Sequence, residues 1–232
     1  MFNSYFTINN TEFNSKDYGL YIDNIIQPNF LEDKDYYTIE AECFFIPDNN
    51  TSLYKCYSNI QNKFLYLLNN NSNLKLSFSF DKNYYYKIAD IQAIIEDRNT
   101  NISKIKITFS VLKYKFLNEE DTLITDMSNI KLNVYELYSF PLFKISMSDM
   151  TTATTITIKV NGSETYTLGN VKSGTDNILF YDSYNMECYS NNNTYDLNCN
   201  GLYPVLLKGI NTISISGDNI KSVVMNSQQV SL

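Results

Sequence analysis

Residues 104–111, Lys-Ile-Lys-Ile-Thr-Phe-Ser-Val, place an apolar side chain at every second position. Side chains alternate between the two faces of a β-strand, so this pattern predicts a strand with one buried and one solvated face. A similar strand character recurs in residues 36–45, 74–80 and 84–95. The turn-rich segments 81–83 and 97–101 separate three of these runs, which predicts an antiparallel meander.

One segment breaks this alternation. From Leu53 onward, apolar residues recur at intervals of four and three, which places them on one face of a helix. The spacing predicts a helix over 52–68 that packs against the sheet as part of the core and does not form a binding groove. We expect Asn50 or Thr51 to cap its start and the asparagines at 69–71 to end it in a left-handed conformation.

The second half of the chain has the regular turn spacing of a β-sandwich. Asn161-Gly162 lies between two alternating runs, and both residues accept the positive φ of a type I′ hairpin turn. Further short strands are expected at 143–147, 178–181, 186–189, 210–215 and 220–225. Gly19 is the only glycine before residue 162, and this shift in composition indicates a domain boundary. The chain is therefore predicted to be mainly β, with an N-terminal β-barrel or sandwich-like domain that carries the helix and a C-terminal β-sandwich.

The composition excludes several classes of function. The 232 residues include no histidine, which excludes Ser-His-Asp and Cys-His catalysis and His-ligated zinc. The formal net charge is −7 and Arg98 is the only arginine, so sequence-specific nucleic-acid binding is not expected. The sequence contains no secretion signal, no apolar run long enough to span a bilayer and no phosphate-loop or calcium-loop pattern. We expect a protein that folds in the cytosol without membrane insertion, cofactor or metal.

Carboxylates are the remaining candidates for catalysis. Glu40 and Glu42 share one face of an expected strand, and Glu119, Glu120 and Asp121 cluster in a loop. Paired-carboxylate catalysis needs two acids that face each other across a cleft, and the spacing establishes no such pair. We interpret both groups as solvated faces and assign no catalytic residue.

The four cysteines have no metal-binding spacing. Cys43, Cys56, Cys188 and Cys199 are expected to be mostly buried thiols. Cys188 and Cys199 flank an asparagine-rich turn and could face each other across a hairpin, although a cytosolic protein would keep such a pair reduced.

The chain also carries an ordered set of short motifs. The C-terminal set consists of Gly201, Tyr203, Pro204, Leu206, Gly209, Asn211 and Ile213. Upstream lie the segments 177–183, Asn-Ile-Leu-Phe-Tyr-Asp-Ser, and 138–145, Tyr-Ser-Phe-Pro-Leu-Phe-Lys-Ile. Near the start, Phe-Thr-Ile-Asn at 6–9 precedes Ser-Lys-Asp-Tyr-Gly-Leu at 15–20. In this order the motifs resemble the distal tail protein family of long-tailed bacteriophages, of the siphovirus type; residues 121–129 have no counterpart in that pattern.

The resemblance implies a structural hub of a phage tail tip or baseplate and no enzymatic activity. It implies that residues 1–138 form a hexameric ring and that residues 139–232 form a galectin-like β-sandwich. The partners it implies are the tail tube protein, a tail-associated hub or lysin protein, the tape measure protein in the lumen and a receptor-binding protein. The expected location is the virion tail tip, after assembly in the cytoplasm of the bacterial host.

The family motifs imply a structural signature without catalytic, cofactor or metal residues. Its members are Gly19, Pro141, Gly201, Pro204, Gly209 and Asn211. We expect residues 201–213 to form a structural turn and not a ligand site, since proline fixes φ and glycine permits bends.

A second hypothesis comes from the tyrosines. A β-sandwich that exposes Tyr189, Tyr195 and Tyr203 together would suit a carbohydrate-binding module that attaches to a host cell-wall polymer. The two hypotheses differ in whether these rings share one solvent-facing surface.

Overall fold

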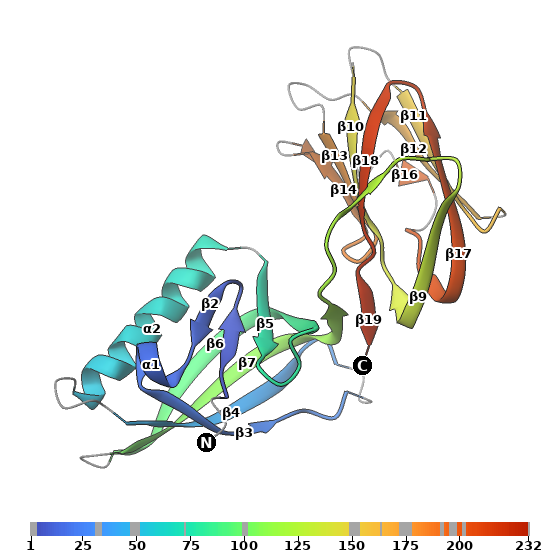
Figure 1. The fold of residues 1–232 in the computed structure, drawn as a ribbon. Coiled ribbons are helices and arrows are strands. Elements are labelled where there is room, and N and C mark those ends of the chain that lie inside the picture. Colours follow the sequence, from blue (N-terminus) through green and yellow to red (C-terminus); the bar gives the residue numbers. More distant parts are fainter. Residues whose placement is uncertain are drawn as a thin grey trace. The chain divides into compact units, whose positions relative to one another are not determined.

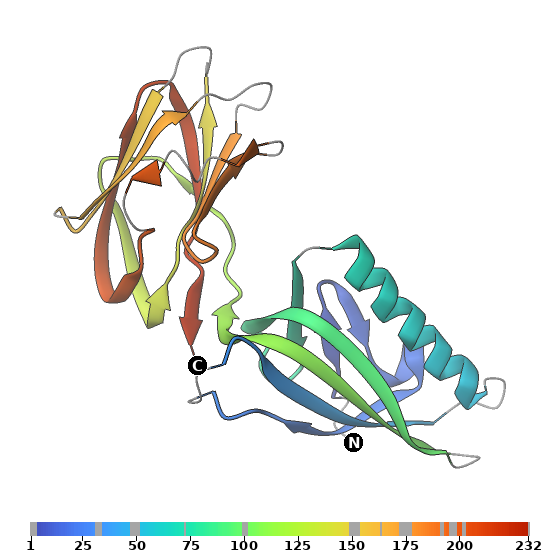
Figure 2. The same cartoon turned by 180° about the vertical axis from the view of Figure 1, so that it is seen from behind.

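A computed structural model describes the chain in eleven segments. They are residues 4–30, 34–46, 52–71, 73–98, 102–148, 154–162, 164–171, 178–190, 193–194, 199–200 and 203–231. The chain divides into two compact units, Met1–Asn118 and Glu119–Ser231, each built mainly from antiparallel strands (Figures 1 and 2). Within the described segments, no helix combines the length and the apolar character needed to cross a membrane.

The first unit is a single antiparallel sheet with a long helix on it. In spatial order its strands are β3 (Leu20–Ile26), β4 (Tyr37–Phe45), β7 (Ser103–Leu117), β6 (Tyr84–Arg98), β5 (Leu74–Phe78), β1 (Phe6–Ile8) and β2 (Thr11–Phe13). The helices are α1 (Ser15–Tyr18) and α2 (Leu53–Asn70). Because β5, β6 and β7 are neighbours in both sequence and space, the predicted meander is confirmed.

The alternation in β7 builds the core of this unit. Its inward side chains, Ile105, Ile107, Phe109 and Val111, are fully buried. Their β4 partners and, apart from the half-buried Ile95, their β6 partners are buried on the same face. Helix α2 adds Cys56, Ile60, Phe64 and Leu67 from the other side. The helix is therefore part of the core, as its apolar spacing predicts.

Both ends of α2 differ from the expectation. Its N-cap is Ser52, not Asn50 or Thr51, and the Ser52 hydroxyl accepts a hydrogen bond from the Lys55 N–H at 3.3 Å. The C-cap residue Asn71 is extended, with φ of −140°, so the left-handed ending is wrong. The side-chain amides of Asn70 and Asn71 instead donate to carbonyls of the last helical turn at 2.8 and 3.0 Å, which leaves those carbonyls satisfied without a left-handed residue.

The second unit is a sandwich of two antiparallel sheets. The first sheet contains β16 (Cys199–Asn200), β12 (Glu164–Val171), β11 (Thr154–Val160), β17 (Leu206–Gly217), β9 (Ile130–Ser139) and β19 (Gln229–Ser231). The second contains β15 (Asn193–Thr194), β14 (Glu187–Ser190), β13 (Ile178–Asp182), β10 (Leu142–Met147), β18 (Ile220–Asn226) and β8 (Thr122–Ile124). Inward residues of both sheets form one core. Asn161 and Gly162 have φ of 51° and 75°, which confirms the hairpin between β11 and β12.

The division between the units lies at Asn118/Glu119, earlier than the expected boundary at 138/139. The reason is non-local pairing: β8 pairs with β18, and β9 pairs with β17 and β19, so residues 122–139 belong to the sandwich.

Cys188 and Cys199, which could have faced each other across a hairpin, lie in different sheets. Cys188 lies in β14, which pairs with β13 and β15, whereas Cys199 lies in β16, which pairs with β12 in the other sheet. Cys43, Cys56 and Cys188 are buried, as expected, and the side chain of Cys199 lies outside the described residues.

Candidate functional site

The acids of β4 lie on the outer face of the first unit's sheet, where they pair with lysines of β7. Lys106 Nζ lies 2.6 Å from Glu40 Oε2, and Lys104 Nζ lies 3.7 Å from Glu42 Oε1 and 3.4 Å from Glu96 Oε2. Glu42 and Glu96 raise the pKa of Lys104, and the hydrogen bond to Glu40 raises that of Lys106. Glu40 and Glu42 are thus members of a partly solvated charge lattice, as predicted, and do not face each other across a cleft.

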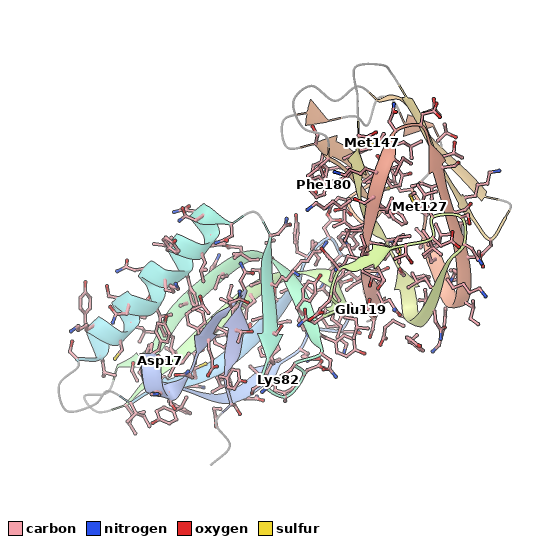
Figure 3. All side chains as sticks on the ribbon, turned by 45° about the horizontal axis from the view of Figure 1, so that its top comes forward. Asp17, Lys82, Glu119, Met127, Met147 and Phe180 are labelled. Atoms are coloured by element: carbon pink, nitrogen blue, oxygen red, sulfur yellow. The ribbon has the colours of Figure 1, made fainter. Side chains whose placement is uncertain are left out.

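The second acidic group divides into exposed and partly buried members. Glu120 and Asp121 are exposed, and all three acids lie in a loop, as expected. Glu119, labelled in Figure 3, is half-buried and accepts hydrogen bonds from Gln229 Nε2 at 3.0 Å and from the Ser227 hydroxyl. Burial raises the pKa of Glu119, although the bond from Gln229 opposes that shift. The solvated-face interpretation therefore does not hold for Glu119.

Gln229 is the centre of this polar cluster and is 1% exposed. Its Oε1 accepts from the backbone N–H groups of Tyr135 at 2.7 Å and Glu136 at 3.4 Å. Its Nε2 donates to Glu119 and to the carbonyl of Asn133 at 3.3 Å. One buried amide thus ties the first residue of the second unit to an irregular part of β9. The arrangement is a structural tie, and Glu119 and Ser227 also line a surface pocket of about 350 Å³.

Asn211 explains the Gly-x-Asn spacing of the C-terminal motif. Its side chain is 5% exposed, and its Nδ2 donates to the carbonyls of Leu207 at 2.8 Å and Gly209 at 3.1 Å. Gly209 has φ of +115°, a conformation that favours glycine. The asparagine therefore bonds back to the kink that the glycine makes in β17, and Asn161 in turn donates to Asn211 Oδ1 at 3.1 Å.

The other signature positions are also backbone features. Gly19 ends α1 with φ of 63°, and its N–H donates to the Ser15 carbonyl at 3.0 Å. A Cβ at Gly19 would lie only 3.1 Å from the carbonyl oxygen of Ile46. Pro141 and Pro204 are buried in the segments that precede β10 and β17, and Gly201 lies outside the described residues.

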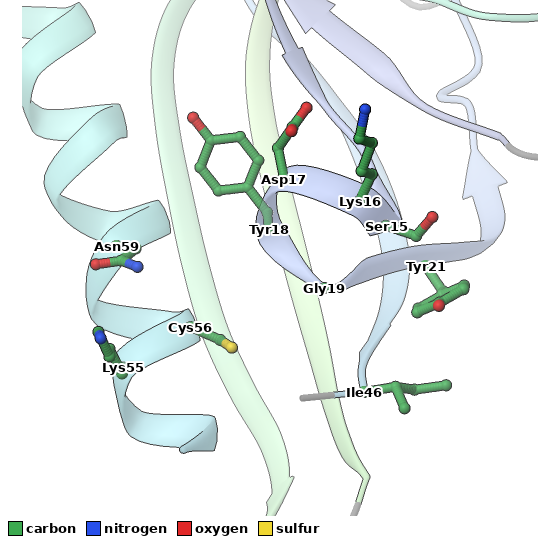
Figure 4. A pocket seen from close by; sticks show the side chains of 10 residues that line it. All are labelled: Ser15, Lys16, Asp17, Tyr18, Gly19, Tyr21, Ile46, Lys55, Cys56 and Asn59. Atoms are coloured by element: carbon green, nitrogen blue, oxygen red, sulfur yellow. The ribbon is translucent and has the colours of Figure 1, made fainter. Parts of the chain in front are cut away.

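A surface pocket of about 430 Å³ lies beside α1 and the start of α2 (Figure 4). Its lining includes Lys16, Asp17, Tyr18, Lys55 and Cys56. Burial, with a smaller effect of Asp17, raises the pKa of the Tyr18 hydroxyl, so this phenol stays protonated at neutral pH. Across the described part of the chain, no three His, Cys, Asp or Glu residues are grouped so that they could hold a metal ion.

Of the tyrosines proposed for sugar stacking, the two that the structure describes have different surroundings. Tyr189 lies on β14 and stacks on Phe180, with ring centroids 5.1 Å apart. Tyr203 packs against the sandwich core and contacts the buried ring of Tyr181 at 4.6 Å. Tyr195 lies outside the described residues. The two described rings therefore give no support to a carbohydrate platform.

Comparison with known proteins identifies the fold. No protein-family model matches the sequence, and no curated protein matches it. Among solved structures, the chain is similar to the SPP1 Dit (gp 19.1) protein, described as a paradigm of the hub adsorption apparatus in phages that infect Gram-positive bacteria. The TM-score is 0.57 at 12% identity, over 96% of this chain and 97% of that one. The chain has the fold of a phage hub protein.

A second comparison gives the same fold. The chain is similar to a component of the phage P2 baseplate in its activated conformation with Ca, with a TM-score of 0.54 at 12% identity and 96% coverage of both chains. The hub-protein fold includes both units, in agreement with the family resemblance of the ordered motifs.

Sequence reasoning singled out Gly209 and Asn211, but the turn expected over 201–213 is wrong for residues 206–213, which belong to the kinked strand β17. It also missed the tie at Gln229. Gly209 and Asn211 stand out because glycine and asparagine are informative residue types. Gln229 gave no such signal, since its partners Tyr135 and Glu119 are 94 and 110 residues away. Gln229 belongs to no recognisable sequence motif, and its role follows only from the residues that the fold brings around it.

Proposed function

We propose that this chain is a structural hub protein in the tail tip of a bacteriophage or phage-tail-like particle. The observation that carries the proposal is the match to the SPP1 Dit protein over almost the whole length of both chains. The chain also folds into two compact units, which would suit one unit for assembly and one for presentation.

The proposed role is not enzymatic, and the surroundings of the candidate acids support a structural role. Glu40 and Glu42 are engaged by lysines, and Glu119 is bound by Gln229 and Ser227. Paired-carboxylate chemistry requires a free acid and a base aimed at one substrate bond. These three acids instead hold strands together or cover a sheet.

The finer proposal is a homo-hexameric ring formed by the first unit. The ring would join the tail tube protein to the tail-associated hub or lysin protein, and the second unit would project outward toward a receptor-binding protein. The tape measure protein and then the genome would pass through the lumen. The net charge of −7 suits a conduit for DNA, because a ring of this charge would repel phosphates and not retain them.

Light scattering and negative-stain electron microscopy of the full chain test the ring. The expected result is a closed ring with the mass of a hexamer, alone or after mixing with the tail tube and hub or lysin proteins, since tail proteins can need a template. A protein that stays monomeric in every mixture would refute the proposal. Immunogold labelling would test the location at the virion tail tip.

A further inference from the structure

Four large apolar side chains are exposed together on the first sheet of the sandwich. Tyr135 and Leu137 of β9 are 65% and 44% exposed, and Leu207 and Ile210 of β17 are 64% and 76% exposed. The two strands pair in an antiparallel ladder, and Figure 1 shows them side by side. We call these four residues the β9–β17 patch. Single exposed apolar residues are ordinary, but a cluster on adjacent strands marks an interaction surface.

The β17 half of the patch depends on an irregular backbone. Residues three apart in a regular strand point to opposite faces, yet Leu207 and Ile210 are both exposed while their outer neighbours Leu206 and Asn211 are buried. The register shifts between Leu207 and Gly209, where the positive φ of Gly209 lies. The kink held by Asn211 therefore turns a second apolar side chain outward.

The β9 half depends on a bulge. Leu207 lies opposite Tyr138 and Gly209 opposite Val134, so the three residues between those β9 positions face a single residue of β17. The buried Gln229 side chain binds the backbone of this bulge, with its amide oxygen and nitrogen both engaged. Bulges often re-aim side chains at functional sites. The buried side chains of Asn211 on β17 and Gln229 on β19 thus bind the irregular backbone beside the patch.

The charge around the patch is opposite to that of the whole protein. The charged residues of β9, β11 and β17 are Lys131, Lys159 and Lys208 and the single acid Glu136. The three lysines are exposed, and Glu136 is half-buried. In a chain with net charge −7, these three strands thus carry a local excess of positive charge, and Glu119, bound by Gln229, is a further acid beside the β9 end of the patch.

We propose that the β9–β17 patch is a docking surface for another protein, through a segment whose apolar side chains are flanked by carboxylates. Three of the four patch residues are aliphatic, and Tyr135 is the only aromatic one. This composition suits apolar protein side chains better than sugar rings, which bind to aromatic faces. The exposed lysines supply charge complementarity for the flanking acids and disfavour basic partners.

A peptide array tests the proposal with the full chain. Two sets of short peptides share the same apolar centres of Leu, Ile, Phe and Tyr, one flanked by Glu and Asp and the other by Lys and Arg. Fluorescently labelled protein should bind members of the acid-flanked set saturably, and binding should weaken as salt rises. Leu207→Ser or Ile210→Ser should weaken it about tenfold or more. Lys208→Glu should shift the preference toward the base-flanked set.

Leu123→Ser is the matched control, because Leu123 is 61% exposed but lies on β8 in the other sheet. It should leave peptide binding unchanged, and thermal melting should show that all variants fold as the wild type does. The proposal is overturned if no acid-flanked peptide binds, if both sets bind equally, or if Leu123→Ser costs as much as Leu207→Ser. Sedimentation that shows Ile210→Ser dissociating an oligomer, without peptide competition, would assign the patch to a second copy instead.

Discussion

Replacing Asn211 by alanine should destabilise the sandwich unit strongly. The substitution removes a buried amide that donates to the carbonyls of Leu207 at 2.8 Å and Gly209 at 3.1 Å. Both carbonyls are part-buried, and each that loses its donor costs about 1–2 kcal/mol. We expect the free energy of unfolding to fall by about 2–4 kcal/mol, which lowers the melting temperature of a unit of this size by about 8–15 °C. Differential scanning calorimetry of the full chain measures this shift.

Asn133→Ala is the control, since Asn133 is exposed on β9 opposite Ile210. An exposed substitution of this kind should change stability by less than about 0.5 kcal/mol. Asn211→Asp tests the direction of the hydrogen bonds, because a carboxylate would face two carbonyl oxygens and should be at least as destabilising as alanine at neutral pH. If Asn211→Ala melts like Asn133→Ala, the amide does not hold the kink and the reasoning is refuted.

Three further predictions concern other parts of the chain. Gly209→Val should lower the free energy of unfolding by about 1–3 kcal/mol through backbone strain alone, since φ at Gly209 is +115° and a Cβ there would have no atom within 4 Å. Ring formation should survive this substitution. A melting curve equal to that of the wild type would contradict the prediction. Burial raises the pKa of Glu119, so the folded state still holds this proton at pH values where the unfolded chain has lost it. The contribution of Glu119 to stability therefore falls as the pH rises above the ordinary pKa of a glutamate. Melting curves between about pH 4 and pH 7 should show a smaller decline for Glu119→Gln, and identical pH profiles would exclude the effect. Phe109→Ala should destabilise the first unit by about 3–5 kcal/mol, because Phe109 is fully buried and its ring meets that of Phe6 edge-on, with centroids 5.2 Å apart. Chemical denaturation measures this change, and a loss of stability below about 1 kcal/mol would contradict the prediction.

Local patterns predicted the elements that local physics determines. The period of two in residues 104–111 became β7, and the period of 3.6 after Leu53 became α2. Asn161-Gly162 formed its hairpin because both residues tolerate positive φ. These elements depend on neighbours in sequence, which a single sequence displays.

The features that escaped prediction depend on residues far apart in the chain. Residues 122–139 join the sandwich only because β17 and β18 supply their partners, which moves the boundary to Asn118/Glu119. Glu119 is half-buried for the same reason, since Gln229 and Ser227 from the end of the chain bind its carboxylate. Register and long-range pairing are set by the whole fold, so no local sequence pattern predicts them.

The central claim is that this protein is a tail-tip hub, and electron microscopy of the native particle with this protein labelled tests it most directly. The account predicts label confined to one end of the tail, with a sixfold ring at that position in the averaged images and both units of the fold fitting each of its subunits. Label on the capsid, label along the length of the tail tube, or particles whose tail tip lacks this protein would contradict it.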